Sequence, residues 1–170
     1  PFISPNQKGH FSTREKKDVL PENNRGVLAV PQILTNRAGD FLLASKKLAE
    51  MGYREINLNL GCPSGTVTAK KKGSGFLLYP DDLDRFFDEV FSDASVRNGE
   101  FQISVKARSG KNEVEEWPEI MAVYNRYPIS ELTVHPRIQK EFYKGVPHLD
   151  VFADILKAVS YTHLRAHETD

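Results

Sequence analysis

The stretch Ile56-Asn57-Leu58-Asn59-Leu60-Gly61-Cys62-Pro63 decides the fold class of this chain. Apolar and polar residues alternate from Ile56 to Leu60, which is typical of a β-strand with one buried face. Gly61-Cys62-Pro63 then ends the strand, because glycine and proline both interrupt regular structure. The segment therefore predicts a strand whose carboxyl end delivers a cysteine to a loop.

Further strands are predicted on both sides of this one. Short apolar runs indicate strands at 27–30, 103–107 and 132–135, and residues 1–4 resemble the remnant of an earlier strand. A helix-like segment follows each predicted strand. The first is expected to be capped by Asn36 and to end at Gly52, because these residue types favour helix starts and stops.

The other helices are predicted from their apolar stripes. The clearest begins at Pro80 and presents Leu83, Phe86, Phe87, Val90, Phe91 and Ala94 on one face. The next places Trp117, Ile120, Met121 and Tyr124 on one face and is stopped by Pro128. The last carries Leu149, Phe152, Ala153 and Leu156. This alternation predicts an α/β fold with a parallel sheet, either doubly wound or closed as a barrel.

The connection after Cys62 is the longest, and residues 63–79 form an insertion there. No predicted strand is followed by a GxGxxG or Walker-type loop, which weakens the nucleotide-binding doubly wound alternative.

Composition excludes several classes of protein. The chain has 170 residues, 39% hydrophobic and 27% charged, which fits one ordinary domain. The 23 basic residues equal the 23 acidic ones, so a globally basic nucleic-acid binder is excluded. No apolar run approaches the roughly 20 residues that span a bilayer. The single cysteine excludes an internal disulfide framework and fits a cytoplasmic location.

The two ends suggest that residues 1–159 are an internal fragment. The chain begins without a methionine, and residues 160–170 are expected to be a non-native or disordered tail. Within this tail, His163 and His167 have the four-residue spacing that places two metal ligands on one helix face. No third ligand is nearby, so no metal site is expected.

Polar residues gather where the predicted strands end. They are Gln32, Asn59, Cys62, Lys106, Arg108, His135 and Arg137. In a parallel barrel the carboxyl ends of the strands meet on one face, where active sites are built from several strands. The pattern predicts one shared active site.

Each of these residues also has a purely structural interpretation. A lone cysteine is often a small buried hydrophobe, but Cys62 lies in a strand-end loop and can donate a proton or act as a nucleophile. Lys106 is costly to bury unless it meets an anion or an electron-rich ring. His135 can cap a strand end, and Asn59 can satisfy loop backbone.

Two basic segments favour a nucleic-acid partner. Lys70, Lys71 and Lys72 form either a solvated face or a contact with phosphates, which lysine binds without reading sequence. Phe142 and Tyr143 offer a surface on which a base can stack. The cations around these aromatic residues are Arg137, Lys140 and Lys144.

The stretch 56–78, INLNLGCPSGTVTAKKKGSGFLL, closely resembles the signature of the tRNA-dihydrouridine synthase family, whose Asn-x-Gly-Cys-Pro core falls on Asn59, Gly61, Cys62 and Pro63. VPQIL at 30–34, VKAR at 105–108 and VHPRIQKEFYKG at 134–145 resemble the glutamine, lysine and histidine strands of that family. The resemblance extends to about residue 159. The four motifs in this order are highly specific.

The resemblance implies an FMN-binding (β/α)₈ barrel that reduces the 5,6 double bond of particular uridines in tRNA, with NADPH as the reductant of the flavin. It implies that Cys62 is the general acid that protonates C5. It also implies that Gln32, Lys106 and His135 contact the flavin.

The same resemblance implies that Asn59, Arg108 and Arg137 lie on the substrate side. Together with the proposed contacts of Lys70, Lys71, Lys72 and Tyr143, they form the expected tRNA-binding set. No membrane and no obligate protein partner are expected.

The chain departs from the family pattern at both ends. About five of the eight strands are present, which makes the fold a partial TIM barrel, and the segments that hold the flavin phosphate and the RNA-binding domain are missing. The fragment itself is therefore expected to fold poorly and to be inactive. Two alternatives stay open for the parent protein: an FMN barrel oxidoreductase of the dihydroorotate-dehydrogenase type that acts on a small molecule, and a non-catalytic RNA-binding module.

Overall fold

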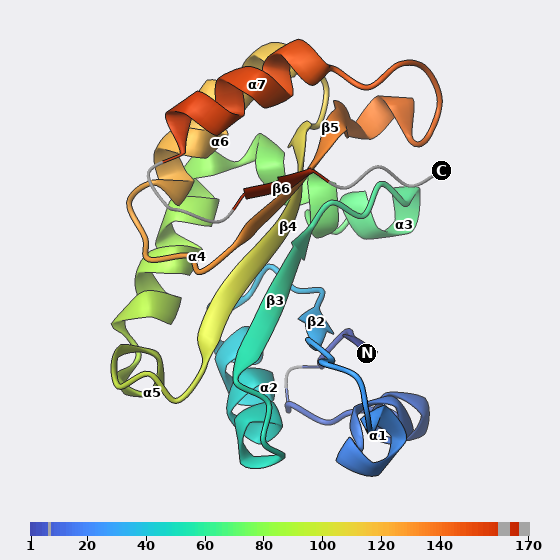
Figure 1. Ribbon diagram of the computed structural model, residues 1–170, viewed down its shortest axis with the longest axis vertical. Coiled ribbons are helices and arrows are strands. Elements are labelled where there is room, and N and C mark those ends of the chain that lie inside the picture. Colours follow the sequence, from blue (N-terminus) through green and yellow to red (C-terminus); the bar gives the residue numbers. More distant parts are fainter. Residues whose placement is uncertain (7, 160–163, 167–170) are drawn as a thin grey trace.

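A computed structural model describes residues 1–6, 8–159 and 164–166 (Figure 1). One parallel sheet runs through the molecule, and its described strands are β1 (Phe2–Ile3), β2 (Gln32–Ile33), β3 (Glu55–Leu60), β4 (Gln102–Gly110), β5 (Leu132–Ile138) and β6 (Leu164–Ala166). The strands lie in the sheet in the order in which they follow along the chain. A doubly wound sheet reverses its strand order at a switch point, whereas a barrel wall keeps one direction. The strand order therefore indicates a partial barrel and not a doubly wound sheet.

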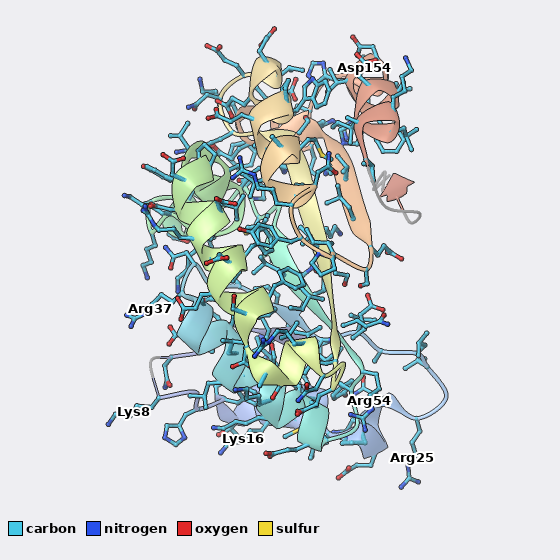
Figure 2. The ribbon with its side chains drawn as sticks, turned by 90° about the vertical axis from the view of Figure 1, so that its left-hand side faces the viewer. Lys8, Lys16, Arg25, Arg37, Arg54 and Asp154 are labelled. Carbon is cyan, nitrogen blue, oxygen red and sulfur yellow. The ribbon has the colours of Figure 1, made fainter. Side chains whose placement is uncertain are left out.

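Helices connect the strands. The α-helices are α1 (Thr13–Val19), α2 (Ala38–Glu50), α3 (Gly65–Thr68), α4 (Pro80–Ser92), α5 (Ala94–Arg97), α6 (Trp117–Tyr124) and α7 (Leu149–Ala158). The 3₁₀ turns are η1 (Pro21–Asn24), η2 (Gly73–Leu78), η3 (Val114–Glu116) and η4 (Gln139–Glu141). Helices α2, α4, α6 and α7 contact one another in succession, and Figure 2 shows α4 and α6 in front of the sheet.

The core lies between the sheet and these helices. Ile56, Leu58 and Leu60 of β3 have no exposed surface, while the alternate residues of the same strand are half-buried. Phe86 and Phe87 of α4 pack edge-on against neighbouring aromatic rings of the core. Alternation thus separates an outer face of the sheet, packed under helices, from an inner face that carries polar side chains.

Several predicted boundaries are confirmed. Strand β3 begins one residue before the predicted start, and α4 has Pro80 in its first turn with a buried stripe on one face. The predicted stripe is too long, because α4 ends at Ser92 and Ala94 is exposed in α5. Gly52 follows α2 with φ +101°, a left-handed conformation that favours glycine. Strand β1 occupies part of the predicted remnant at 1–4. The predicted strands at 1–4, 56–60, 103–107 and 132–135 correspond to β1, β3, β4 and β5.

The prediction of a strand at 27–30 is wrong. Val27 is 66% exposed and Leu28 is 99% exposed, so this apolar run is not in the core. The strand of this region is β2, which begins after Pro31. Proline has no N–H for the ladder, and here the Pro31 carbonyl accepts a bond from Asn57 instead.

Two details of the helices also differ from the prediction. Asn36 does not cap α2, whose N-cap is Arg37; the Asn36 amide donates to the Lys70 carbonyl at 3.1 Å. In α7 the buried residues are Val151 and Ile155. The residues predicted to face the core are only partly covered or exposed: Leu149, Phe152, Ala153 and Leu156. Val151 and Ile155 are four residues apart and therefore lie on one face of α7, and this face packs inward in place of the predicted one.

The expected tail at 160–170 falls mostly outside the described residues. His163 and His167 both lie there. Residues 164–166 are described as β6, which pairs in parallel with β5.

Candidate active site at the carboxyl ends of the strands

A cavity of about 200 Å³ opens at the carboxyl ends of the central strands. Its polar lining consists of Gln32, Asn59, Cys62, Lys106, Arg108, His135 and Tyr143. The structure therefore brings together seven of the residues that the sequence singled out. Arg137, Lys70, Lys71 and Lys72 are not among the residues that line this cavity.

The backbone of the cysteine loop, Gly61–Pro63, is held first by the side chain of Asn59. Its Oδ1 accepts the N–H of Gly61 at 3.0 Å and the N–H of Cys62 at 2.9 Å. Pro63 has no N–H to satisfy. Every backbone donor of the loop is thus paired with one amide oxygen at the end of β3.

The three carbonyls of the cysteine loop are paired as well, each with a different segment. Arg108 Nε donates to Gly61 O at 2.9 Å. The N–H and hydroxyl of Ser74 donate to Cys62 O at 3.1 and 2.9 Å. Gln139 Nε2 donates to Pro63 O at 3.0 Å. With its backbone groups all paired, the loop holds the Cys62 side chain against the cavity.

Glycines of the insertion let η2 approach this loop closely. Gly73 has φ +57°, and a Cβ atom there would lie 2.8 Å from Cys62 O and 2.9 Å from Cys62 Cβ. A Cβ on Gly75 would lie 2.7 Å from the backbone of Thr68. A side chain at position 73 would push η2 away from the cysteine loop, and one at position 75 would push η2 away from α3.

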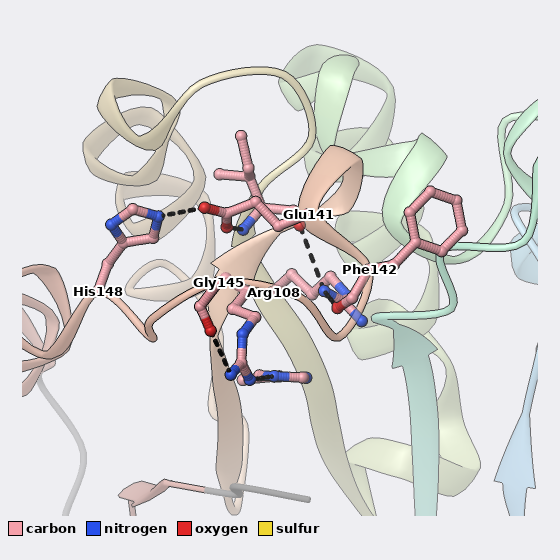
Figure 3. A network of polar contacts seen from close by, with 8 residues as sticks. Arg108, Glu141, Phe142, Gly145 and His148 are labelled. Atoms are coloured by element: carbon pink, nitrogen blue, oxygen red, sulfur yellow. Dashed lines mark hydrogen bonds and ion pairs between the residues drawn. The ribbon is translucent and has the colours of Figure 1, made fainter.

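Arg108 joins the cysteine loop to the loop that follows β5. The residue is 3% exposed, and its Nη1 donates to Phe142 O at 2.7 Å and to Ile138 O at 3.2 Å (Figure 3). Its guanidinium also lies 5.3 Å from the ring centre of Tyr143, a cation–π contact. Burial lowers the pKa of the Arg108 guanidinium from its ordinary value, but an arginine keeps its charge in proteins.

His135 is held from behind by Arg137. Arg137 Nη1 lies 2.7 Å from His135 Nε2, and both side chains are buried. Arginine has donors only, so His135 Nε2 is the acceptor and carries no proton. Arg137 Nη2 donates to Gly145 O at 3.2 Å, which ties the pair to the same loop after β5.

Within the loop after β5, Glu141 holds the backbone through its own contacts, which Figure 3 shows. Glu141 Oε2 accepts the N–H of Ile138 at 2.8 Å, and Glu141 Oε1 lies 2.7 Å from His148 Nε2. Between these anchors Tyr143 remains 63% exposed while its ring lies 5.9 Å from that of His135. The loop therefore presents an aromatic side chain at the rim of the cavity.

Lys106 contributes a cation to the cavity from the middle of β4. It is half-buried, and none of the described carboxylates forms an ion pair with it. Burying part of an ammonium without a partner is unfavourable. The donor set around it, with the Gln32 and Asn59 amides, suits a ligand that offers carbonyl or anionic acceptors.

The lysine cluster lies outside this cavity, after α3. Lys70 and Lys71 are exposed and Lys72 is half-buried. Lys71 Nζ lies 4.2 Å from the ring centre of Tyr79. The cluster is a separate basic surface beside the insertion.

Sequence reasoning missed the residues that hold the site together. They are Asn57, Ser104, Ser74, Gln139 and Gly73. Strand alternation was the available signal for Asn57, because it places this residue on the same face as Asn59. The partners Ser74 and Gln139 come from remote segments, and nothing in their local sequence indicates their contacts.

No group of three histidine, cysteine, aspartate or glutamate side chains in the described part of the chain is arranged to hold a metal ion. No helix among the described residues has the length and apolar character needed to cross a membrane.

A parallel sheet in barrel order, with a cysteine, a lysine and a histidine gathered at its strand ends, defines a partial α/β-barrel with a candidate active site at the strand ends. The chain matches the dihydrouridine synthase family model, "Dihydrouridine synthase (Dus)", over residues 1–164. This chain therefore belongs to the dihydrouridine synthase family, as its motifs predicted.

Individual relatives agree with this assignment. The chain is 32% identical over 126 residues to a "Probable tRNA-dihydrouridine synthase" of Staphylococcus aureus (strain N315), covering 74% of the chain and 37% of that relative. It is 28% identical over 128 residues to "Probable tRNA-dihydrouridine synthase 2" of Bacillus subtilis (strain 168), covering 75% and 38%. The chain thus spans little more than a third of the length of these curated relatives.

Proposed function

We propose that the complete protein reduces the C5=C6 bond of specific uridines in tRNA to dihydrouridine, with FMN as cofactor and NADPH as reductant. The observation that carries this proposal is the Cys62 thiol, presented by a fully paired loop at a cavity that also contains Lys106. Membership of the dihydrouridine synthase family and the printed names of the relatives support the reaction and its tRNA substrate. A tRNA substrate implies a cytoplasmic enzyme.

Gln32, Lys106 and His135 form the proposed flavin side of the site. When bound, FMN supplies the hydride chemistry, while the protein supplies binding and orientation. Lys106 would offer its cation to an electron-rich ring, and Gln32 would offer a ring carbonyl the one amide N–H that it does not give to Asn57. Arg137 Nη1 lies against His135 Nε2, which selects one tautomer of the imidazole that would contact the flavin.

Cys62 is the proposed general acid. Its thiol donates a proton to C5 of the uracil ring as C6 receives a hydride, so that the double bond gains two hydrogens and the thiolate takes the charge. A cysteine thiol carries one S–H donor, which suits an acid. The hydrogen bonds to the Gly61–Pro63 backbone position the thiol at the cavity, as general acid catalysis requires.

The remaining residues form the proposed tRNA side. Asn59 and Arg108 line the cavity, and the exposed Tyr143 at its rim can stack on a base. Arg137 does not line the cavity and acts through its contact with His135. Outside the cavity, Lys70, Lys71 and Lys72 contact phosphates of the tRNA backbone, which bind lysine as a point charge.

The test is Cys62→Ala in the complete protein, assayed for dihydrouridine in tRNA together with the flavin absorbance of the purified variant. We expect turnover to fall roughly 10²–10⁴-fold, the usual contribution of a general acid, with flavin content unchanged. Turnover at the parent rate would overturn the role of Cys62.

The parent protein in the same assay separates the alternatives. Flavin absorbance with reduction of dihydroorotate-like small molecules, and none of tRNA, would identify a small-molecule oxidoreductase. A protein that binds tRNA and no flavin would be an RNA-binding module.

A further inference from the structure

A continuous chain of side-chain hydrogen bonds runs along the inner face of the sheet and ends at the cysteine loop. Asn59 Nδ2 donates to Gln32 Oε1 at 2.7 Å, and Gln32 Nε2 donates to Asn57 Oδ1 at 2.8 Å. Asn57 Nδ2 in turn donates to Ser104 Oγ at 3.0 Å. These four residues, Ser104, Asn57, Gln32 and Asn59, are called the amide ladder below.

The register of the sheet explains why the ladder can form. Gln32, Asn57 and Ser104 are aligned across β2, β3 and β4, so their side chains leave the sheet on one face at neighbouring positions. Asn59 lies two residues beyond Asn57 on the same face. Three strands therefore each contribute to one row of polar groups.

The direction of the ladder is determined at its cysteine end. The backbone N–H groups of Gly61 and Cys62 can only donate, so they require the oxygen of Asn59 to face them. The nitrogen of Asn59 must then meet the oxygen of Gln32, and the same requirement passes to Asn57. Turning any one amide over would set donor against donor.

We propose that Asn57 is a positioning residue: with Ser104 it fixes the orientation of the Gln32 and Asn59 amides and thereby holds the loop that carries Cys62. Asn57 does not line the cavity, whereas Gln32 and Asn59 do. Its effect on Cys62 therefore passes through its neighbours. The functional meaning of this placement rests on the proposed role of Cys62, but the placement itself can be tested without turnover.

The matched variants are Asn57→Leu and Asn57→Asp in the complete protein. Leucine has a similar size and can neither donate nor accept, so the ladder is broken. Aspartate still accepts from Gln32, and its second oxygen can accept from the rotatable hydroxyl of Ser104, so the direction of the ladder is kept. Thr133→Val is the control, because Thr133 is a half-buried inner-face residue outside the ladder.

The readout is the rate at which iodoacetamide alkylates Cys62 in the folded protein, followed for the Cys62 peptide by mass spectrometry, with a thermal melt of each variant. We expect Asn57→Leu to label about fivefold faster. Breaking the ladder should lower the free energy that holds the loop closed by about 1 kcal/mol, the net contribution of a typical hydrogen bond, so the loop opens more often. Asn57→Asp and Thr133→Val should label close to the parent rate.

A folded Asn57→Leu variant that labels at the parent rate would overturn the proposal, and so would an Asn57→Asp variant that labels as fast as the leucine variant. If Asn57→Leu does not fold, Ser104→Ala carries the test, since it removes only the last acceptor of the ladder; a parent rate there would overturn the proposal. Because labelling does not depend on dihydrouridine formation, a failure of the proposed function leaves this test intact.

Discussion

The two faces of β3 and β4 differ in chemistry although they share the same backbone. On the outer face Ile56, Leu58 and Val105 have no exposed surface and pack under the helices. On the inner face, the aligned pair Asn59 and Lys106 borders the cavity. A TIM barrel usually fills its interior with bulky branched residues, so the polar inner face supports the ligand site proposed there.

Residues that stabilise the fold and residues that line the cavity thus occupy alternate positions of the same strands. A substitution on the outer face should act on folding, with loss of the site as a consequence. A substitution on the inner face should act on the site while the melt changes little. Substitutions can test this contrast between a stabilising outer face and a functional inner face, and the largest effect is expected in the core.

Leu58→Ala is the strongest test of the outer face. The side chain is fully buried, so its truncation should lower the free energy of unfolding by about 2–5 kcal/mol. Denaturant unfolding of the complete protein measures this change. The control is Leu149→Ala, because Leu149 is 56% exposed and its loss should cost less than about 0.5 kcal/mol. Equal costs for the two variants would contradict the assigned core.

Gly73→Ala extends the comparison to the insertion that packs on the cysteine loop. Its left-handed φ and the short distances to Cys62 should make alanine cost about 1–3 kcal/mol. The matched control, Gly39→Ala in α2, has open space and an ordinary φ, so it should stabilise by about 0.4–1 kcal/mol. Thermal melts of both variants check the opposite signs, and the same sign in both would refute the close approach.

Asp93→Asn should have the smallest effect on stability, and this effect should depend on pH. Asp93 lies among the helices, at the N-cap of α5. A hydrogen bond from Lys46 Nζ at 2.9 Å and the N–H of Ser95 lower the pKa of Asp93 from its usual value near 3.8. A lowered pKa means that the carboxylate stabilises the fold above its unfolded pKa, and that this contribution is lost as the pH falls through the folded value.

The measurement for this residue is unfolding between pH 7 and pH 2. Asp93→Asn should be less stable than the parent near neutral pH, and the difference should shrink in acid. The control is Asp88→Asn, since Asp88 is exposed on α4. A difference between Asp93→Asn and the parent that stays constant down to pH 2 would contradict the ionic role of Asp93.

The sequence predicted most of this division, and its failures have physical causes. Alternation located the buried face of β3 and the cysteine at its end, because period two is a local signal. It misplaced β2, since a two-residue strand has no period and the nearby run 27–30 is apolar yet exposed. The bonds from Ser74 and Gln139 to the cysteine loop depend on tertiary register, which no local pattern contains.

The inner face of the sheet is the part of the molecule that we propose binds the cofactor. The most direct measurement is a flavin absorbance titration of Lys106→Met in the complete protein, with its neighbour Val105→Ala, on the outer face, as control. We predict that Lys106→Met keeps the parent melting temperature and binds FMN about tenfold or more weakly, the loss of a hydrogen bond from a charged group. Val105→Ala should melt earlier and, while folded, bind FMN like the parent. Parent-like FMN binding by Lys106→Met would contradict the claim.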